Sequence, residues 1–246
     1  MAGNGGVSGV HYLYFDRHEF TVLLSALRVD SMLCFAQQER RGISQEDYDL
    51  GLFSLFKRGL VKRVDGTDGF SVESGCRRLF DVVKASRCMV TLECKDGRVP
   101  QYGLYWHEGK CTVVSPGQRE QEYVRMASLK GSDAGIFIEE SGILPANDEA
   151  GIGDERIGLL PMADEGFEAL LLEKPDPDDA RIYAFGQTMV RIMQMENRTG
   201  EALAAIYLLE QPLQNKCIRI RTERKAEVTP YDRKRMIAET MEMMEG

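Results

Sequence analysis

The same order of sequence features occurs twice along this chain, and that order restricts the folds open to it. In each copy, a helical pattern leads into an apolar strand, and two turns then separate this strand from two more. The matching pieces are residues 78–80, 89–92 and 111–114 in the first copy and 181–183, 189–192 and 217–220 in the second. A degenerate duplication and a chance likeness between two ordinary meanders both account for the repeat. Either way, the pattern predicts antiparallel meanders packed with helices.

Local signals place further elements before the first meander. Asp16 is a predicted N-cap, and Ser44 is a predicted N-cap for a helix that Gly59 ends. A strand, a glycine-rich turn and a second strand follow this helix, which is how a winged helix ends. The predicted elements are a strand at 11–15, helices at 16–29 and 44–58, strands at 60–64 and 70–72, and a helix at 73–85.

The remaining elements follow from alternation and turn signals. In the first half, we predict strands at 87–94, 101–107, 110–115 and 123–129 and a helix at 134–140. In the second half, we predict a helix at 178–185 and strands at 189–196, 203–210 and 216–222. Thr229 and Pro230 are the favoured N-cap and N1 pair for a last helix that ends near Glu245.

These elements predict an α+β protein of two pseudo-duplicated halves, each a three- to four-strand antiparallel meander with packed helices. The N-terminal part is winged-helix-like. Residues 1–10 lack the basic and apolar regions of a signal peptide and are predicted to be a flexible leader. The glycine- and acid-rich stretch 147–154 is the predicted linker, so the expected halves are 11–146 and 147–246, tightly packed together.

The charge distribution argues against nucleic acid as a partner. The chain of 246 residues has a net charge of −8, and residues 131–246 carry 23 acidic against 13 basic side chains. Such a field repels phosphate backbones. The winged-helix-like part carries a basic cluster at Lys57, Arg58, Lys62 and Arg63, which leaves a DNA-binding regulator as the alternative function. However, Glu46, Asp47 and Asp49 stand at the start of its helix, where base contacts would be made.

No motif for catalysis, metal binding or cofactor binding occurs in the sequence. Two weak candidates remain: a catalytic Cys111–His107 pair on neighbouring strands and a metal site at Cys88 and Cys94. Ordinary buried cysteines and a surface histidine explain these residues more simply. We therefore expect a protein that is not an enzyme, with no catalytic residue, no metal and no cofactor. No apolar stretch is long enough to span a membrane, and no secretion signal precedes the cysteines, so we expect no membrane insertion, reduced thiols and a cytoplasmic location.

Methionines mark the predicted partner-binding surface. Met193 and Met195 fall in one phase of a strand whose other phase is also apolar, so both faces of this strand are expected to be covered. The last helix is also rich in methionine, which adapts to varied partner helices, although core methionines of a docked terminal helix are the simpler explanation. The candidate partner-binding residues are Met193, Met195, Met236, Met241, Met243 and Met244.

The order of the N-terminal motifs resembles that of a known family. The first motif is Phe20-Thr21-Val22-Leu23-Leu24, which leads to the Ser44 helix. The second motif is Leu55-Phe56-Lys57-Arg58-Gly59-Leu60-Val61. The meander then opens with Leu79-Phe80 and Met89-Val90-Thr91-Leu92. This order is similar to that of the EspG-like chaperones associated with ESX, or type VII, secretion systems. The resemblance covers residues 20–129 in motif order and 178–245 as topology only.

The resemblance implies a cytosolic, non-enzymatic chaperone or adaptor. Its partner would be a small helical-hairpin secretion substrate of the WXG or PE/PPE type. No partner-binding residue of that family has a matching motif here. The chain itself is expected to be a monomer or a weak homodimer.

Overall fold

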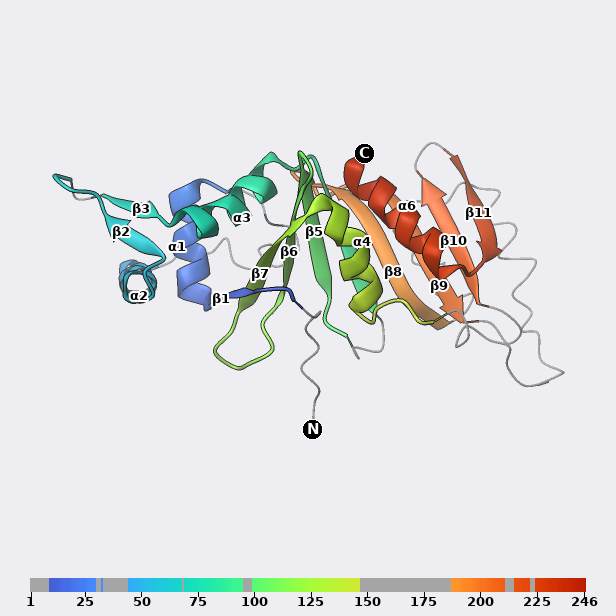
Figure 1. Ribbon diagram of the computed structural model, residues 1–246, viewed down its shortest axis with the longest axis horizontal. Helices are drawn as coiled ribbons and strands as arrows, with labels where there is room; N and C mark the ends of the chain where they lie inside the picture. Colours follow the sequence, from blue (N-terminus) through green and yellow to red (C-terminus); the bar gives the residue numbers. More distant parts are fainter. Residues whose placement is uncertain are drawn as a thin grey trace. The chain divides into compact units, whose positions relative to one another are not determined.

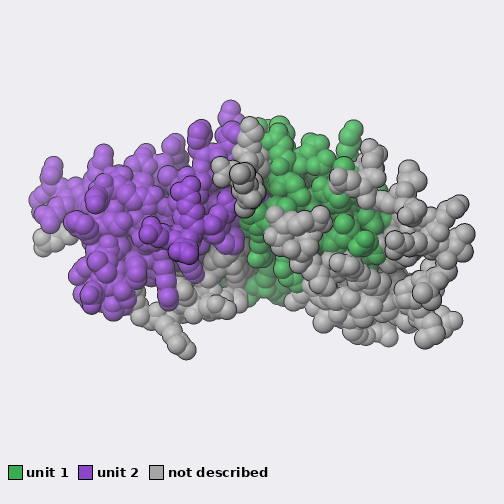
Figure 2. Space-filling view, turned by 90° about the horizontal axis from the view of Figure 1, so that it is seen from below, with its two compact units in different colours: residues 1–8, 88–101, 132–246 green, residues 9–87, 102–131 purple. Residues whose placement is uncertain are grey.

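The computed structural model describes residues 9–29, 32, 44–67, 69–94, 99–146, 187–210, 215–221 and 224–246. These residues form two compact units, coloured separately in Figure 2. Unit 2 holds the described residues of Gly9–Arg87 and Tyr102–Gly131, and unit 1 holds those of Cys88–Gln101 and Ser132–Gly246. The predicted boundary at Asn147 and the predicted helix at 178–185 lie outside the described residues, as does the acidic stretch beyond Ala146.

Unit 2 combines helices with an antiparallel sheet of strand order β1-β7-β6-β5 and a separate β2–β3 ribbon (Figure 1). Its elements are β1 (Leu13–Phe15), α1 (Arg17–Leu27), α2 (Gln45–Lys57), β2 (Val61–Arg63), β3 (Phe70–Val72), α3 (Ser74–Ala85), β5 (Tyr102–His107), β6 (Lys110–Pro116) and β7 (Val124–Lys130). Each of these elements was predicted from the sequence to within a few residues.

Short-range capping and aromatic packing explain the helices of unit 2. Asp16 and Glu19 form a capping box at the start of α1, with the Glu19 N–H donating to Asp16 Oδ1 at 2.8 Å. The rings of Phe15, Phe20 and Phe80 then meet in the core, with centroids 6.0–6.4 Å apart. Full burial of one such ring stabilises the fold by about 1.5–3 kcal/mol, so this cluster holds α1 and α3 against β1.

In its described residues, unit 1 has a five-stranded antiparallel sheet of order β4-β8-β9-β10-β11 and two helices. Its elements are β4 (Cys88–Cys94), α4 (Gly131–Glu140), β8 (Gln187–Glu196), β9 (Ala202–Glu210), β10 (Lys216–Arg221), β11 (Arg224–Pro230) and α6 (Arg233–Glu245). The predicted α+β class with antiparallel meanders is therefore confirmed. In both parts of the chain a helix follows the meander at once: α4 follows β5-β6-β7, and α6 follows β8-β9-β10-β11.

The predicted start of the last helix is wrong. Thr229 and Pro230 end β11, where they pair with Cys217 and Lys216, and Asp232 is the N-cap of α6. The carboxylate of Asp232 accepts a hydrogen bond from the Arg235 N–H at 3.0 Å. A proline is tolerated here because β11 is the last strand in the sheet order, and an outward-facing position needs no ladder donor.

Candidate partner-binding surface

Helix α6 lies on one face of the unit 1 sheet. Gln194 Nε2 of β8 donates to the carbonyl oxygen of Met243 at 2.7 Å, and Arg219 of β10 forms an ion pair with Glu239. Since neighbouring strand residues point to opposite faces, Met193 and Ile218 lie on the other side of the sheet. The sheet therefore has one face that carries α6 and one that carries an apolar cluster.

The Arg219–Glu239 pair fixes the position of α6. The two side chains are only 8% and 14% exposed, so both charges are largely withdrawn from water. Arg219 also donates to Thr229 Oγ1 on β11, and Arg235 Nε donates to Glu239 Oε1 at 2.8 Å. A buried charge is tolerated only when it is paired and hydrogen-bonded, so strand β10, strand β11 and helix α6 depend on one another.

Helices α4 and α6 lie side by side in unit 1 (Figure 1). A Cβ built on Gly135 would lie 3.7 Å from Ile237 Cγ2, which is ordinary van der Waals contact. The Tyr231 hydroxyl donates to the Pro145 carbonyl oxygen at 2.7 Å, and the Arg233 guanidinium donates to the Glu139 carbonyl oxygen at 2.6 Å. These contacts join α4 and the chain that follows it to the start of α6.

Three large apolar side chains on these helices are accessible. Ile136 of α4 is 55% exposed, and Ile237 and Met241 of α6 are half-buried. We call Ile136, Ile237 and Met241 the α4–α6 ridge. A ridge of flexible apolar side chains on two packed helices can contact the apolar face of another helix.

The opposite face of the sheet carries the apolar cluster. Its buried members are Met193, Ala205, Tyr207, Leu209, Ile218 and Ile220, with Met195, Ala202 and Ala226 packed against them. The predicted common phase of Met193 and Met195 is confirmed by this cluster.

The structure distributes the six predicted partner-binding methionines over three places. Met193 and Met195 lie in the cluster just described, and only Met195 of the two is partly exposed. Met236, Met243 and Met244 are buried on α6, whereas Met241 belongs to the α4–α6 ridge. Their contact with a partner stays a prediction, and Met195 and Met241 are the members that solvent reaches.

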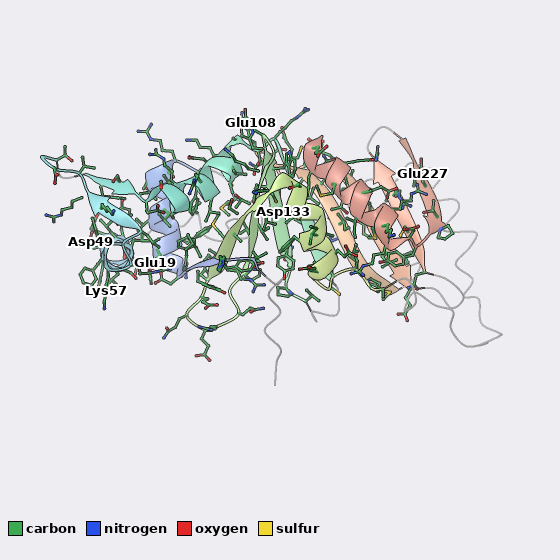
Figure 3. All side chains as sticks on the ribbon, viewed as in Figure 1. Glu19, Asp49, Lys57, Glu108, Asp133 and Glu227 are labelled. Carbon is green, nitrogen blue, oxygen red and sulfur yellow. The ribbon has the colours of Figure 1, made fainter. Side chains whose placement is uncertain are left out.

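The winged-helix-like part of unit 2 presents few basic groups for DNA along its helix. The guanidinium of Arg58 pairs with the buried carboxylate of Glu19, which also accepts from Ser54 Oγ at 2.7 Å. Figure 3 labels Glu19 near the packed helices and Asp49 and Lys57 on α2. The exposed surface of α2 carries acidic and apolar side chains at the positions where a recognition helix would meet base edges.

The weak chemical candidates of the sequence are not assembled into a site. Cys111 pairs with Trp106 across β5 and β6, while His107 pairs with Lys110, and burial raises the pKa of the Cys111 thiol to about 12. Cys88 and Cys94 stand six residues apart on one strand, roughly 20 Å along its axis, which is too far to share one ion. Within the described ranges, no three His, Cys, Asp or Glu side chains are grouped to hold a metal.

The buried charge of Arg125 was not predicted from the sequence. Arg125 of β7 is fully buried, its Nε donates to Ser115 Oγ, and its guanidinium carbon lies 4.9 Å from the Tyr12 ring centroid and 5.7 Å from that of Tyr102. Burial raises the pKa of both tyrosines, so they stay neutral beside the arginine. The only sequence signal was a charged residue inside an apolar strand, which is usually an outward-facing position.

Among the residues described, no helix combines the length and apolar character that crossing a membrane requires.

The fold is similar to that of the type VII secretion system chaperone EspG5 of Mycobacterium tuberculosis, whose structure was solved in complex with the PE25–PPE41 dimer. The match covers 95% of this chain and 95% of that chain, with a TM-score of 0.50 and 11% sequence identity. No family model matches the sequence, and no curated protein matches it. The resemblance drawn from the motif order is thus supported at the level of the fold.

Proposed function

We propose that this protein is a cytosolic, non-enzymatic chaperone or adaptor of a type VII-like secretion system. Its client would be a helical-hairpin protein of the WXG or PE/PPE type. The observation that carries the proposal is a fold shared over 95% of both chains with a chaperone solved in complex with a PE–PPE dimer. The motif order of residues 20–129 supports it independently of the coordinates.

The α4–α6 ridge, which contains Met241 of the predicted partner-binding residues, suits such a client. A secretion substrate with an apolar helical tip needs that tip covered until it is exported. Ile136, Ile237 and Met241 offer accessible apolar contacts on helices whose relative position is fixed by hydrogen bonds. A stable complex buries roughly 800 Å² on each partner, so the ridge would form the centre of a larger interface.

The first experiment identifies the client. The tagged chain is used to capture proteins from the cytosol of its native organism, and mass spectrometry identifies what is bound. We expect a stoichiometric helical protein of the secretion-substrate type. Tight, salt-sensitive binding of duplex DNA without a protein partner would contradict the proposal and support the winged-helix regulator instead.

The second experiment locates the interface with the purified client. The variant Ile136→Glu plus Met241→Glu places two carboxylates on the ridge, and we expect calorimetry to show at least tenfold weaker binding. The matched control is Val228→Glu on β11, which alters an exposed apolar side chain of the same unit and should leave the affinity unchanged. Equal binding by the ridge variant would place the interface elsewhere.

Met243 and Met244 are poor positions for this test because both are buried. A glutamate at either position would lose its hydration inside the sheet–helix layer, so loss of binding would report on loss of folding as well.

A further inference from the structure

Helix α2 exposes an apolar and charged stripe on the side opposite its packed face. Leu50 is 55% exposed and Phe53 is 69% exposed, which is the largest exposed fraction among the large apolar side chains in the described residues. At 100° per residue, Glu46, Leu50, Phe53 and Lys57 fall on one side of the helix. The buried Gly51 and Leu55 fall on the other side. We call Glu46, Asp49, Leu50, Phe53 and Lys57 the α2 stripe.

The packed side of α2 is held rigidly, so the stripe has a fixed presentation. Gly51 lies against the backbone of α1, where an added Cβ would be 2.6 Å from the His18 carbonyl carbon. Ser54 and Arg58 both bond to the buried Glu19 carboxylate. An adjacent pair of exposed apolar side chains on a fixed helix indicates a contact surface rather than scattered surface residues.

The order of charges along the stripe is self-complementary. Acidic Glu46 and Asp49 stand toward the N-terminal end, the apolar Leu50 and Phe53 stand in the middle, and basic Lys57 stands at the C-terminal end. Leu50 and Phe53 are equally far from the point midway between residues 51 and 52, and so are Glu46 and Lys57. An antiparallel copy of the same helix therefore places Phe53 opposite Leu50 and Lys57 opposite Glu46.

We propose that two copies of this protein associate through the α2 stripe, with the two α2 helices antiparallel about a twofold axis. A twofold interface requires one patch that is complementary to itself, and this stripe meets that requirement. In the dimer, Leu50 and Phe53 of each copy form the apolar centre, and two Glu46–Lys57 pairs flank it. The stripe does not suit DNA, because its middle is apolar and its N-terminal end is acidic.

The dimer is expected to be weak and to depend on concentration. A helix of 13 residues is roughly 20 Å long, and one helix face buries less than the roughly 800 Å² per partner of a standard interface. The dissociation constant should accordingly lie in the micromolar range. The inference does not rest on the proposed chaperone function, since it concerns only contacts between copies of this chain.

Sedimentation velocity of the full chain over a range of micromolar concentrations tests the dimer. We expect a monomer–dimer equilibrium that Phe53→Glu shifts to monomer. The matched control is Val228→Glu, which changes another exposed apolar residue and should leave the equilibrium unchanged. A chain that sediments as a monomer at every concentration, or a dimer that persists in Phe53→Glu, would overturn the proposal.

Charge reversal tests the antiparallel arrangement. Glu46→Lys and Lys57→Glu each create two like-charge contacts, and each should weaken the dimer by about two- to tenfold at low salt. The double variant restores opposite charges across the axis, so its dissociation constant should return toward that of the wild type. No recovery in the double variant would overturn the antiparallel pairing. Unchanged thermal unfolding of each variant shows that folding is intact.

Discussion

Arg219 of strand β10 and Glu239 of helix α6 form an ion pair that is almost withdrawn from solvent. Thr229 on β11 and Arg235 on α6 complete the hydrogen bonding around it. The pair is the point at which the last three elements of the chain meet. Because it lies beneath α6, it positions the helix that carries part of the α4–α6 ridge.

Removing Glu239 should destabilise the protein strongly. In Glu239→Ala the buried Arg219 guanidinium loses its counter-charge, and breaking such a pair costs about 3–5 kcal/mol of unfolding free energy. Urea unfolding measures the difference. Glu242→Ala, at an exposed position of the same helix, is the control and should change the free energy by less than about 0.5 kcal/mol. Similar losses in both variants would contradict the assigned role of the pair.

Two glycines in helix interiors should respond oppositely to alanine. In Gly51→Ala the new Cβ would lie 2.6 Å from the His18 backbone, so overpacking should lower the unfolding free energy by about 1–3 kcal/mol. In Gly135→Ala the nearest atom to the new Cβ would be Ile237 Cγ2 at 3.7 Å, so the better helix propensity should raise the unfolding free energy by up to about 1 kcal/mol. Chemical denaturation measures the sign of the change in unfolding free energy for each variant. A stabilising Gly51→Ala would contradict the close approach of α1 and α2.

The cap of α3 should make stability depend on pH in the acid range. The backbone N–H groups of Gly75 and Cys76 and the Ser74 hydroxyl donate to the Glu73 carboxylate and lower its pKa from 4.5 to about 2. A pKa lowered by folding gives stabilisation that is present above about pH 4.5 and is lost as the pH falls toward about 2.

Comparison of the wild type with Glu73→Gln isolates this contribution. Glutamine keeps an acceptor oxygen but has no charge to titrate, so the difference in unfolding free energy should be largest near neutral pH and shrink between about pH 4.5 and 2. Thermal unfolding at a series of pH values measures it. A difference that is constant with pH would show that the charge of Glu73 does not stabilise the cap.

Buried thiols should be unreactive in the native protein. Burial raises the pKa of Cys76 and Cys111 to about 12 and that of Cys217 to about 11, so almost no thiolate is present near pH 8. Labelling with a thiol reagent and peptide mapping should show Cys94, which is half-buried, modified before these three. Labelling of Cys111 at the rate of Cys94 without denaturant would contradict the described burial.

Local sequence signals were sufficient for most helix starts. Asp16, Ser44 and Gly59 act where they were predicted because capping depends on a few neighbouring residues. Strand β11 was missed although Ala226 and Val228 alternate with Lys225 and Glu227. The Thr229–Pro230 pair is a good helix start in isolation, and only the pairing with β10 makes it a strand end.

The candidate surfaces could be predicted only in part. The alternation of β8 predicted that Met193 and Met195 share a face, and the apolar cluster confirms it. The exposed pair Leu50 and Phe53 of α2 was not predicted from the sequence. Periodicity gives a common face, but it does not tell which face meets water. For that reason the six predicted partner-binding methionines include buried residues such as Met236 and accessible ones such as Met241.

The class of fold could be predicted from sequence alone, as could the order of most elements and the shared face of Met193 and Met195, since these depend on neighbours within a few residues. The tertiary structure decided which faces are covered, because that depends on contacts between segments far apart in the chain. Glu239 is drawn inward by Arg219, 20 residues before it, while Phe53 stays exposed because Gly51 and Leu55 turn the other side of α2 toward the core.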